Sequence, residues 1–121
     1  MSGAIDLGAA ATLVDGGPGL CFEVRVGGER SSAFVVRHGG VLYGYLNRCA
    51  HVPMELDWQP GVFFDVEGEH LMCATHGALY EPASGRCVGG PCAGRGGLMK
   101  LVVEERAGRV VWTPSASMQP A

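Results

Sequence analysis

Charged side chains are scarce in this sequence of 121 residues, and their signs nearly balance. Lys and Arg together number 9 and Asp and Glu number 12, which gives a formal net charge of −3. Nucleic-acid binding relies on a basic surface, so this balance argues against such a partner. The sequence also lacks a run of about 18 apolar residues, so we expect no membrane-spanning helix. Residues Met1–Ala11 lack the basic start and long apolar stretch of a secretory signal, so we expect a cytoplasmic protein.

Several patterns that mark enzymes are missing as well. The sequence has no Ser-His-Asp set, no phosphate-binding glycine motif and no recognisable pair of catalytic carboxylates. Its length suits one domain over residues 1–121 and leaves no room for a second catalytic module. We therefore expect a protein that is not itself an enzyme.

Hydrophobic alternation is the main structural signal, and it predicts an all-β fold. Between Leu20 and Val26, apolar residues at every second position indicate a strand that is buried on one face. Gly27-Gly28 then predicts a hairpin turn. Further strands are predicted at residues 32–37, 41–46, 71–72, 78–81, 98–105 and 109–113, with no convincing helix.

These strands suggest a small antiparallel β-sandwich or barrel as a base domain. A subdomain is inserted into it at about residues 47–92. The N-terminal end, Met1–Ala11, is rich in Gly and Ala, and the C-terminal end, Pro114–Ala121, is small and polar with two prolines. We expect both ends to be loose tails.

Two short cysteine–histidine pairs carry the chemistry of the chain. The first is Cys49-Ala50-His51 and the second is Cys73-Ala74-Thr75-His76. Two thiolates and two imidazoles from separate loops can together hold one metal centre. Such a set occurs in Rieske clusters, where two His replace two Cys on one of the two irons. Structural zinc sites usually group their cysteines in one knuckle, so zinc fits this spacing less well.

The wider context resembles the Rieske [2Fe-2S] ferredoxin family over residues 20–112. The loops around both pairs contain small residues, which let backbone N–H groups approach a negatively charged cluster. The resemblance rests on five features: C-x-H at 49–51, C-x-x-H-G at 73–77, Tyr80-Glu81-Pro82, the turn Ala83-Ser84-Gly85 and the loop Gly90-Pro91.

The resemblance implies one Rieske-type [2Fe-2S] cluster per chain and a set of ligands for it. Cys49 and Cys73 would bind one iron, and His51 and His76 would bind the other near the protein surface. The loop at Gly90-Pro91 would cover the cluster. The family also implies a ferredoxin that accepts single electrons from a flavin reductase. It would deliver them to a terminal oxygenase of the ring-hydroxylating dioxygenase type. Rieske domains share the two-part all-β architecture predicted above.

The sequence departs from the high-potential Rieske proteins at three positions. Met54 and Thr75 stand where those proteins carry a cysteine pair, so that disulfide between the ligand loops cannot form. Ala78 replaces a serine that donates a hydrogen bond to the cluster. Since hydrogen bonds to cluster sulfurs raise the potential, we expect a value near the low end of the Rieske range, about −150 mV. Tyr80 either donates to a ligand sulfur or packs in a strand with its hydroxyl in water.

Three further cysteines remain: Cys21, Cys87 and Cys92. An odd number in a chain without a secretory signal favours reduced thiols over a disulfide framework. We therefore expect free thiols, with a Cys87–Cys92 disulfide as the alternative.

Other polar residues give weaker signals. We interpret His38 and His70 as surface residues of a turn and a strand, outside the ligand set. Asp65, Glu67 and Glu69 form an acidic group that is most simply a solvated turn. A patch that helps docking to a basic partner is the alternative interpretation.

Two other functions remain open from the sequence. The chain is alternatively the Rieske-like small subunit of a larger reductase, such as an assimilatory nitrite reductase. It is otherwise a structural or sensor metal domain that transfers no electrons. All four expected ligands are present, which weighs against those reductase subunits that keep the fold and lose the cluster.

Overall fold

Strands dominate the described chain, as the alternation predicts. The computed structural model describes residues 4–48, 55–57, 59, 61–73, 77–90 and 96–120. In chain order the elements are β1 (Ile5–Ala9), the 3₁₀ helix η1 (Ala10–Thr12), β2 (Leu20–Val26), β3 (Glu29–His38), β4 (Val41–Leu46), β5 (Leu71–Met72), β6 (Leu79–Tyr80), β7 (Cys87–Gly89), β8 (Lys100–Arg106), β9 (Arg109–Thr113) and β10 (Met118–Pro120). Within the described ranges, no helix is long and apolar enough to cross a bilayer.

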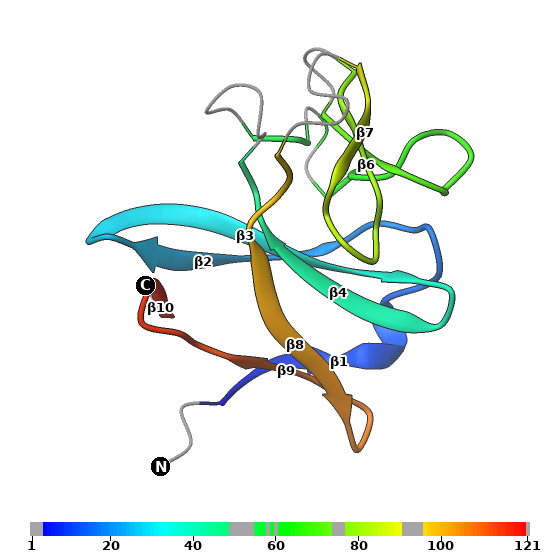
Figure 1. The fold of residues 1–121 in the computed structure, drawn as a ribbon. Coiled ribbons are helices and arrows are strands. Elements are labelled where there is room, and N and C mark those ends of the chain that lie inside the picture. Colours follow the sequence, from blue (N-terminus) through cyan, green and yellow to red (C-terminus); the bar gives the residue numbers. More distant parts are fainter. Residues whose placement is uncertain are drawn as a thin grey trace.

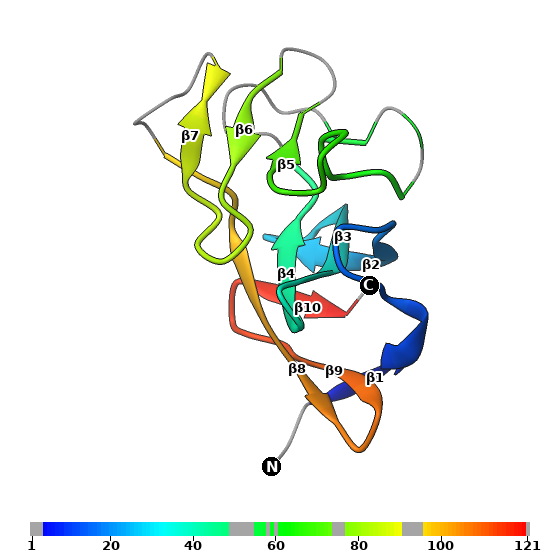
Figure 2. The same cartoon turned by 90° about the vertical axis from the view of Figure 1, so that its right-hand side faces the viewer.

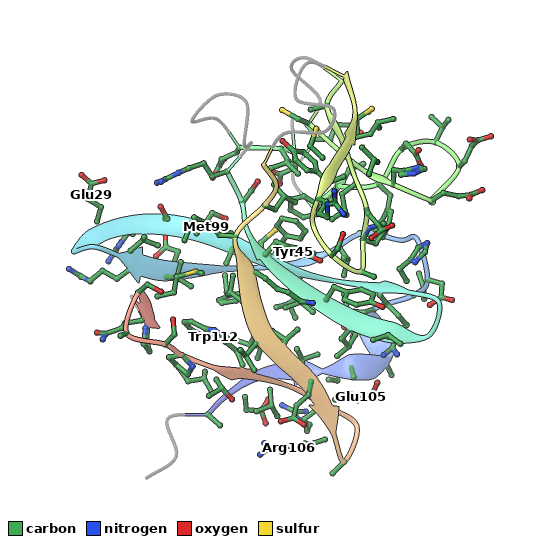
Figure 3. The ribbon with its side chains drawn as sticks, in the orientation of Figure 1. Glu29, Tyr45, Met99, Glu105, Arg106 and Trp112 are labelled. Atoms are coloured by element: carbon green, nitrogen blue, oxygen red, sulfur yellow. The ribbon has the colours of Figure 1, made fainter. Side chains whose placement is uncertain are left out.

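The larger of two antiparallel sheets forms the base of the molecule. Its strand order is β1-β9-β8-β4-β3-β2-β10, and it curls around a core of its own (Figure 1). In β2, Val24 is completely buried while its two neighbours are exposed, which confirms the alternation read from the sequence. Trp112 of β9 lies inside the curl, with its ring centre 5.2 Å from that of Phe22 (Figure 3). The turn at Gly27-Gly28 joins β2 to β3 as predicted.

A second, three-stranded sheet lies at one end of the base sheet (Figure 2). Its order is β5-β6-β7, and its strands come from the sequence between β4 and β8. One buried cluster joins both parts, with Phe34 and Tyr45 from the base and Phe63, Leu71 and Tyr80 from the smaller part. The rings of Phe34 and Phe63 stack with their centres 3.8 Å apart. The predicted fold class is therefore confirmed, while the subdomain limits of about 47–92 stay a prediction.

Tyr45 of β4 marks the boundary between the base sheet and the smaller sheet (Figure 3). It is fully buried, and its hydroxyl donates a hydrogen bond of 2.5 Å to the carbonyl oxygen of Pro82. Gly85, in the same turn, has a φ of +76°, and a Cβ there would lie 2.7 Å from Cε1 of Tyr45. Burial, followed by the nearby Tyr43 and Glu81, raises the pKa of Tyr45. The hydroxyl therefore remains a donor at neutral pH.

The prediction of loose tails is wrong at both ends. Residues of β1 pair with β9, and β10 pairs with β2, so the two ends form the outer strands of the base sheet. The physical reason is burial that composition does not reveal. Met118 is 4% exposed and belongs to the base core, against which Ile5 also packs. An ion pair of 3.0 Å between Asp6 and Arg109 joins β1 to β9.

Candidate metal centre

Of the four predicted ligands, the structure describes Cys73. This residue directly follows β5, is completely buried, and lies in the core cluster shared by both sheets. Cys49, His51 and His76 lie outside the described residues, as do Met54 and Thr75. The ligand set therefore stays a prediction, and the described surroundings of each pair are what the structure adds to it.

The second ligand loop (residues 74–77) is closed by backbone hydrogen bonds. Its ends are held by β5 and β6, where Met72 pairs with Leu79. The N–H of Cys73 donates to the carbonyl of Ala78 at 2.9 Å, and the N–H of Gly77 donates to the carbonyl of Cys73 at 2.8 Å. These backbone hydrogen bonds fix Cys73 from both sides.

A third loop begins at Gly90 and packs directly on this hairpin. Gly90 has a φ of +78°, and a Cβ there would lie 2.8 Å from the Cα of Ala78 and 2.8 Å from the carbonyl oxygen of Gly77. Only glycine satisfies both the backbone angle and this contact. Ala78 itself is completely buried. The expected covering role of the loop at Gly90-Pro91 involves Pro91, which lies outside the described residues.

The first ligand loop (residues 48–55) is closed in a different way, by side chains that the sequence analysis did not single out. Asn47 precedes this loop and is 5% exposed. Its Nδ2 donates to Oδ1 of Asp57 at 2.8 Å, and its Oδ1 accepts from the N–H of Leu56 at 2.8 Å. Asp57 in turn accepts from the N–H of Gly61 at 2.9 Å. The sequence contains one feature that points to this residue: Asn47 is the only asparagine of the chain and stands two residues before Cys49.

Tyr80 is completely buried in the core cluster, next to Cys87 in the pairing of β6 with β7. The alternative in which its hydroxyl lies in water is therefore wrong. No buried side-chain oxygen or nitrogen among the described residues lacks a hydrogen-bond partner. Donation from Tyr80 to a ligand sulfur stays a prediction.

The expectation of a free thiol is wrong for Cys87, which is disulfide-bonded and 3% exposed. Its partner sulfur lies outside the described residues. Cys21 has a free thiol, and an odd total therefore does not argue against one disulfide. Partial burial of this thiol raises the pKa of Cys21, and the carboxylates of Asp57 and Glu55 raise it further.

The two remaining histidines lie in partly exposed places. The His38 ring, at the end of β3, stacks near Phe64 with the ring centres 5.9 Å apart. His70 precedes β5, and its Nδ1 is 3.6 Å from Oδ2 of Asp65. Burial alone would raise the pKa of Asp65. Hydrogen bonds from the N–H groups of Glu69 and His70 outweigh that effect and lower it. Asp65 therefore organises the acidic turn, and is more than a solvated member of it.

The described residues fit an iron–sulfur cluster. Cys73 offers a sulfur in a fully buried position, where access of water is restricted. The hairpin at Gly77 and Ala78 brings backbone close to it. Gly90 lets the third loop approach that hairpin more closely than a residue with a Cβ could. Glycine-rich backbone of this kind lets N–H groups approach bound anions. Cysteine thiolates are the common ligands of such clusters.

Comparison with solved structures shows the same fold. The ferredoxin of carbazole 1,9a-dioxygenase from Nocardioides aromaticivorans IC177 is 21% identical, with a TM-score of 0.68 over 93% of this chain and 98% of that chain. A complex of reduced oxygenase and oxidized ferredoxin in carbazole 1,9a-dioxygenase gives 23% identity and a TM-score of 0.68, covering 91% and 92%. The terminal oxygenase from the same Nocardioides strain gives 19% identity and a TM-score of 0.72. That match covers 98% of this chain and 31% of the oxygenase chain.

Sequence comparison identifies the family. No curated protein is detectably similar in sequence. The family model described as the Rieske [2Fe-2S] domain matches residues 6–116, which is nearly the whole chain and includes both cysteine–histidine pairs. The chain therefore belongs to the Rieske [2Fe-2S] domain family, and its cofactor is a Rieske-type [2Fe-2S] cluster.

Proposed function

We propose that this chain is a cytoplasmic Rieske ferredoxin that transfers single electrons and is not itself an enzyme. It would take them from a flavin reductase and pass them to a terminal oxygenase of a ring-hydroxylating dioxygenase system. Cys49 and Cys73 would bind one iron of the cluster, and His51 and His76 the other. When bound, the cluster supplies reversible one-electron redox chemistry.

One observation carries this proposal: how much of each structural neighbour the chain covers. It spans 98% of the ferredoxin of carbazole 1,9a-dioxygenase, but 31% of the terminal oxygenase chain from the same organism. The likeness thus extends over the whole of a carrier and over under a third of a catalytic subunit. Complexes of oxygenase and ferredoxin among the neighbours support an oxygenase as the acceptor.

The described residues suit a carrier because they hold the predicted ligand Cys73 in place and exclude water from it. Cys73, Ala78 and Tyr80 are all fully buried, so solvent cannot rearrange around this side of the site. Both ends of the Cys73 hairpin are hydrogen-bonded within their own sheet. A rigid, dry surrounding reduces the reorganisation that accompanies each change of charge.

The test has two stages. First, the anaerobically purified protein is reduced with dithionite, its paramagnetic resonance spectrum is recorded, and its iron and zinc are counted. A rhombic Rieske signal with two irons per chain is expected, whereas one zinc and a silent spectrum would refute the assignment of this cluster. Second, NADH and the flavin reductase of a ring-hydroxylating dioxygenase system are added together with its terminal oxygenase. Product formation that depends on this chain is expected, and reduction of the chain without any product would contradict the acceptor.

A further inference from the structure

The neck of the first ligand loop is the best-defined polar feature near the predicted ligands. Asn47 follows β4 directly, and its N–H donates to the carbonyl of Ser32 at 2.8 Å, which holds it to the base sheet. The chain returns at Leu56, nine positions later, where the N–H donates to Oδ1 of Asn47. Leu56 is completely buried in the same core cluster as Cys73. Both ends of the loop are therefore held at one place.

The hydrogen-bond chemistry at this neck allows one orientation of the amide. The Asp57 carboxylate only accepts, so the atom of Asn47 that faces it must be the nitrogen. The N–H of Leu56 only donates, so the atom facing it must be the oxygen. The second oxygen of Asp57 accepts from the N–H of Gly61. Each of these atoms has a partner of the correct kind.

Burial sets this amide apart from the other polar side chains. Aromatic residues apart, Asn47 is the one buried polar or charged side chain among the residues that the structure describes. Burying an amide costs free energy unless its hydrogen bonds are made. Breaking those hydrogen bonds therefore lowers the stability of the folded protein. Leu46 before it belongs to the base core, whereas the side-chain partners of Asn47, Leu56 and Asp57, both follow the first ligand loop. A role at the loop is the simpler explanation.

We propose that Asn47 and Asp57 form a latch that closes the first ligand loop and positions Cys49 and His51 for the cluster. The inference rests on the ligand set of the proposed function. Both residues are positioning residues, since they act through the loop that they close. Replacing residues that orient metal ligands from outside the ligand shell typically changes metal affinity or activity by about 10- to 100-fold.

A swap of the two side chains tests the latch with little change in shape. Asn47→Asp sets a carboxylate against the Asp57 carboxylate, and Asp57→Asn sets an amide nitrogen against an N–H donor or another amide nitrogen. The double variant restores every donor–acceptor pair, because the amide of residue 57 then donates to the carboxylate of residue 47. That carboxylate still accepts from Leu56. The net charge of the double variant equals that of the wild type.

The measurements are the rate of cluster loss, followed by visible absorbance during incubation with a chelator, and the line shape and g-values of the reduced protein. Each single variant is expected to lose its cluster about tenfold faster or more and to shift or broaden the signal. The double variant is expected to return both readouts to within about twofold of wild type. Asp65→Asn is the matched control for Asp57→Asn, because it also removes one negative charge but does so at a turn outside the first ligand loop.

The outcomes separate a latch from general stabilisation. Single variants that melt earlier but keep the wild-type g-values and cluster lifetime would overturn the proposal, and so would a double variant that restores neither. An Asn47→Asp protein that takes up no cluster at all supports the latch if the double variant takes it up normally. These readouts use dithionite and no partner protein. Failure of electron delivery to an oxygenase would therefore refute the proposed function and leave this test unaffected.

Discussion

The two ligand loops are held by different kinds of interaction, although each presents one cysteine and one histidine. The first loop is closed by side chains, since the buried amide of Asn47 binds both the N–H of Leu56 and the half-buried carboxylate of Asp57. The second is closed by the backbone of its own hairpin, through Cys73 and Ala78. Substitutions of side chains should therefore weaken the first loop, whereas an added Cβ in the glycine-rich backbone should weaken the second.

The largest effect is expected when a substitution removes a predicted cluster ligand from either loop. Cys73→Ser and His51→Ala should each abolish the visible absorbance of the Rieske cluster, because a Rieske centre has two protein ligands on each iron. Far-ultraviolet circular dichroism should keep the strand signature, since the base sheet has its own core. Unchanged absorbance and g-values in His51→Ala would show that the ligand set is wrong.

The next effect tests the backbone closure of the second loop. Gly90→Ala places a Cβ 2.8 Å from the Cα of Ala78 and should force the third loop away. Such overpacking typically costs about 1–3 kcal/mol beyond the backbone strain. Gly108→Ala is the matched control, because its φ is +76° and nothing lies within 4 Å of the added Cβ. Equal falls in unfolding temperature for both variants would contradict the contact.

A smaller effect concerns the boundary between the base sheet and the smaller sheet. Tyr45→Phe removes the donor to the Pro82 carbonyl and leaves that oxygen without its partner. A lost buried hydrogen bond of this kind costs about 1 kcal/mol. We expect a lower apparent unfolding temperature and an unchanged cluster spectrum in thermal melts that monitor both signals. A changed cluster spectrum would mean that the hydrogen bond from Tyr45 to Pro82 also affects the geometry of the metal site.

A measurement of the reduction potential tests the role of Tyr80, which lies on β6 beside the second ligand loop. Tyr80→Phe should lower the midpoint potential if the buried hydroxyl donates to a ligand sulfur, because such bonds stabilise the reduced state. A hydrogen bond worth about 1 kcal/mol corresponds to roughly 40 mV for one electron. Spectroelectrochemical titration checks this, with Tyr43→Phe, which removes the hydroxyl of a tyrosine that is only partly buried, as the control. An unaltered potential in Tyr80→Phe would show that the hydroxyl has a different partner.

The smallest expected effect is a change in the alkylation rate of Cys21, whose thiol senses the carboxylate of Asp57. Because partial burial and then the carboxylates of Asp57 and Glu55 raise the pKa of Cys21 above its ordinary value, little thiolate exists at neutral pH. Alkylation of Cys21 should accelerate as the pH rises toward the raised pKa of the thiol. In Asp57→Asn the pKa should fall and the rate at pH 8 should increase, as measured by mass spectrometry. A rate independent of residue 57 would contradict the proximity of the two side chains.

Local patterns in the sequence predicted much of the base sheet. The alternation around Val24 and the glycine turn after it depend on neighbours along the chain, so they can be read without the fold. The outer strands were missed for the opposite reason. The pairing of Ile5 with Trp112 joins residues far apart in sequence, and the small residues around Ile5 gave no apolar alternation to detect. Met118 likewise gains its burial only from β2 and the base core.

By itself, the sequence determined the family chemistry: two cysteine–histidine pairs in loops that contain small residues, on a strand-forming chain with little net charge. These follow from residue types and short spacings, which need no long-range contact. Only the tertiary structure showed that Asn47 closes one loop and that Gly90 packs on the other. It also showed that Cys87 is disulfide-bonded and that Tyr80 is buried. Each depends on which distant backbone lies beside a side chain, and only the folded chain decides that.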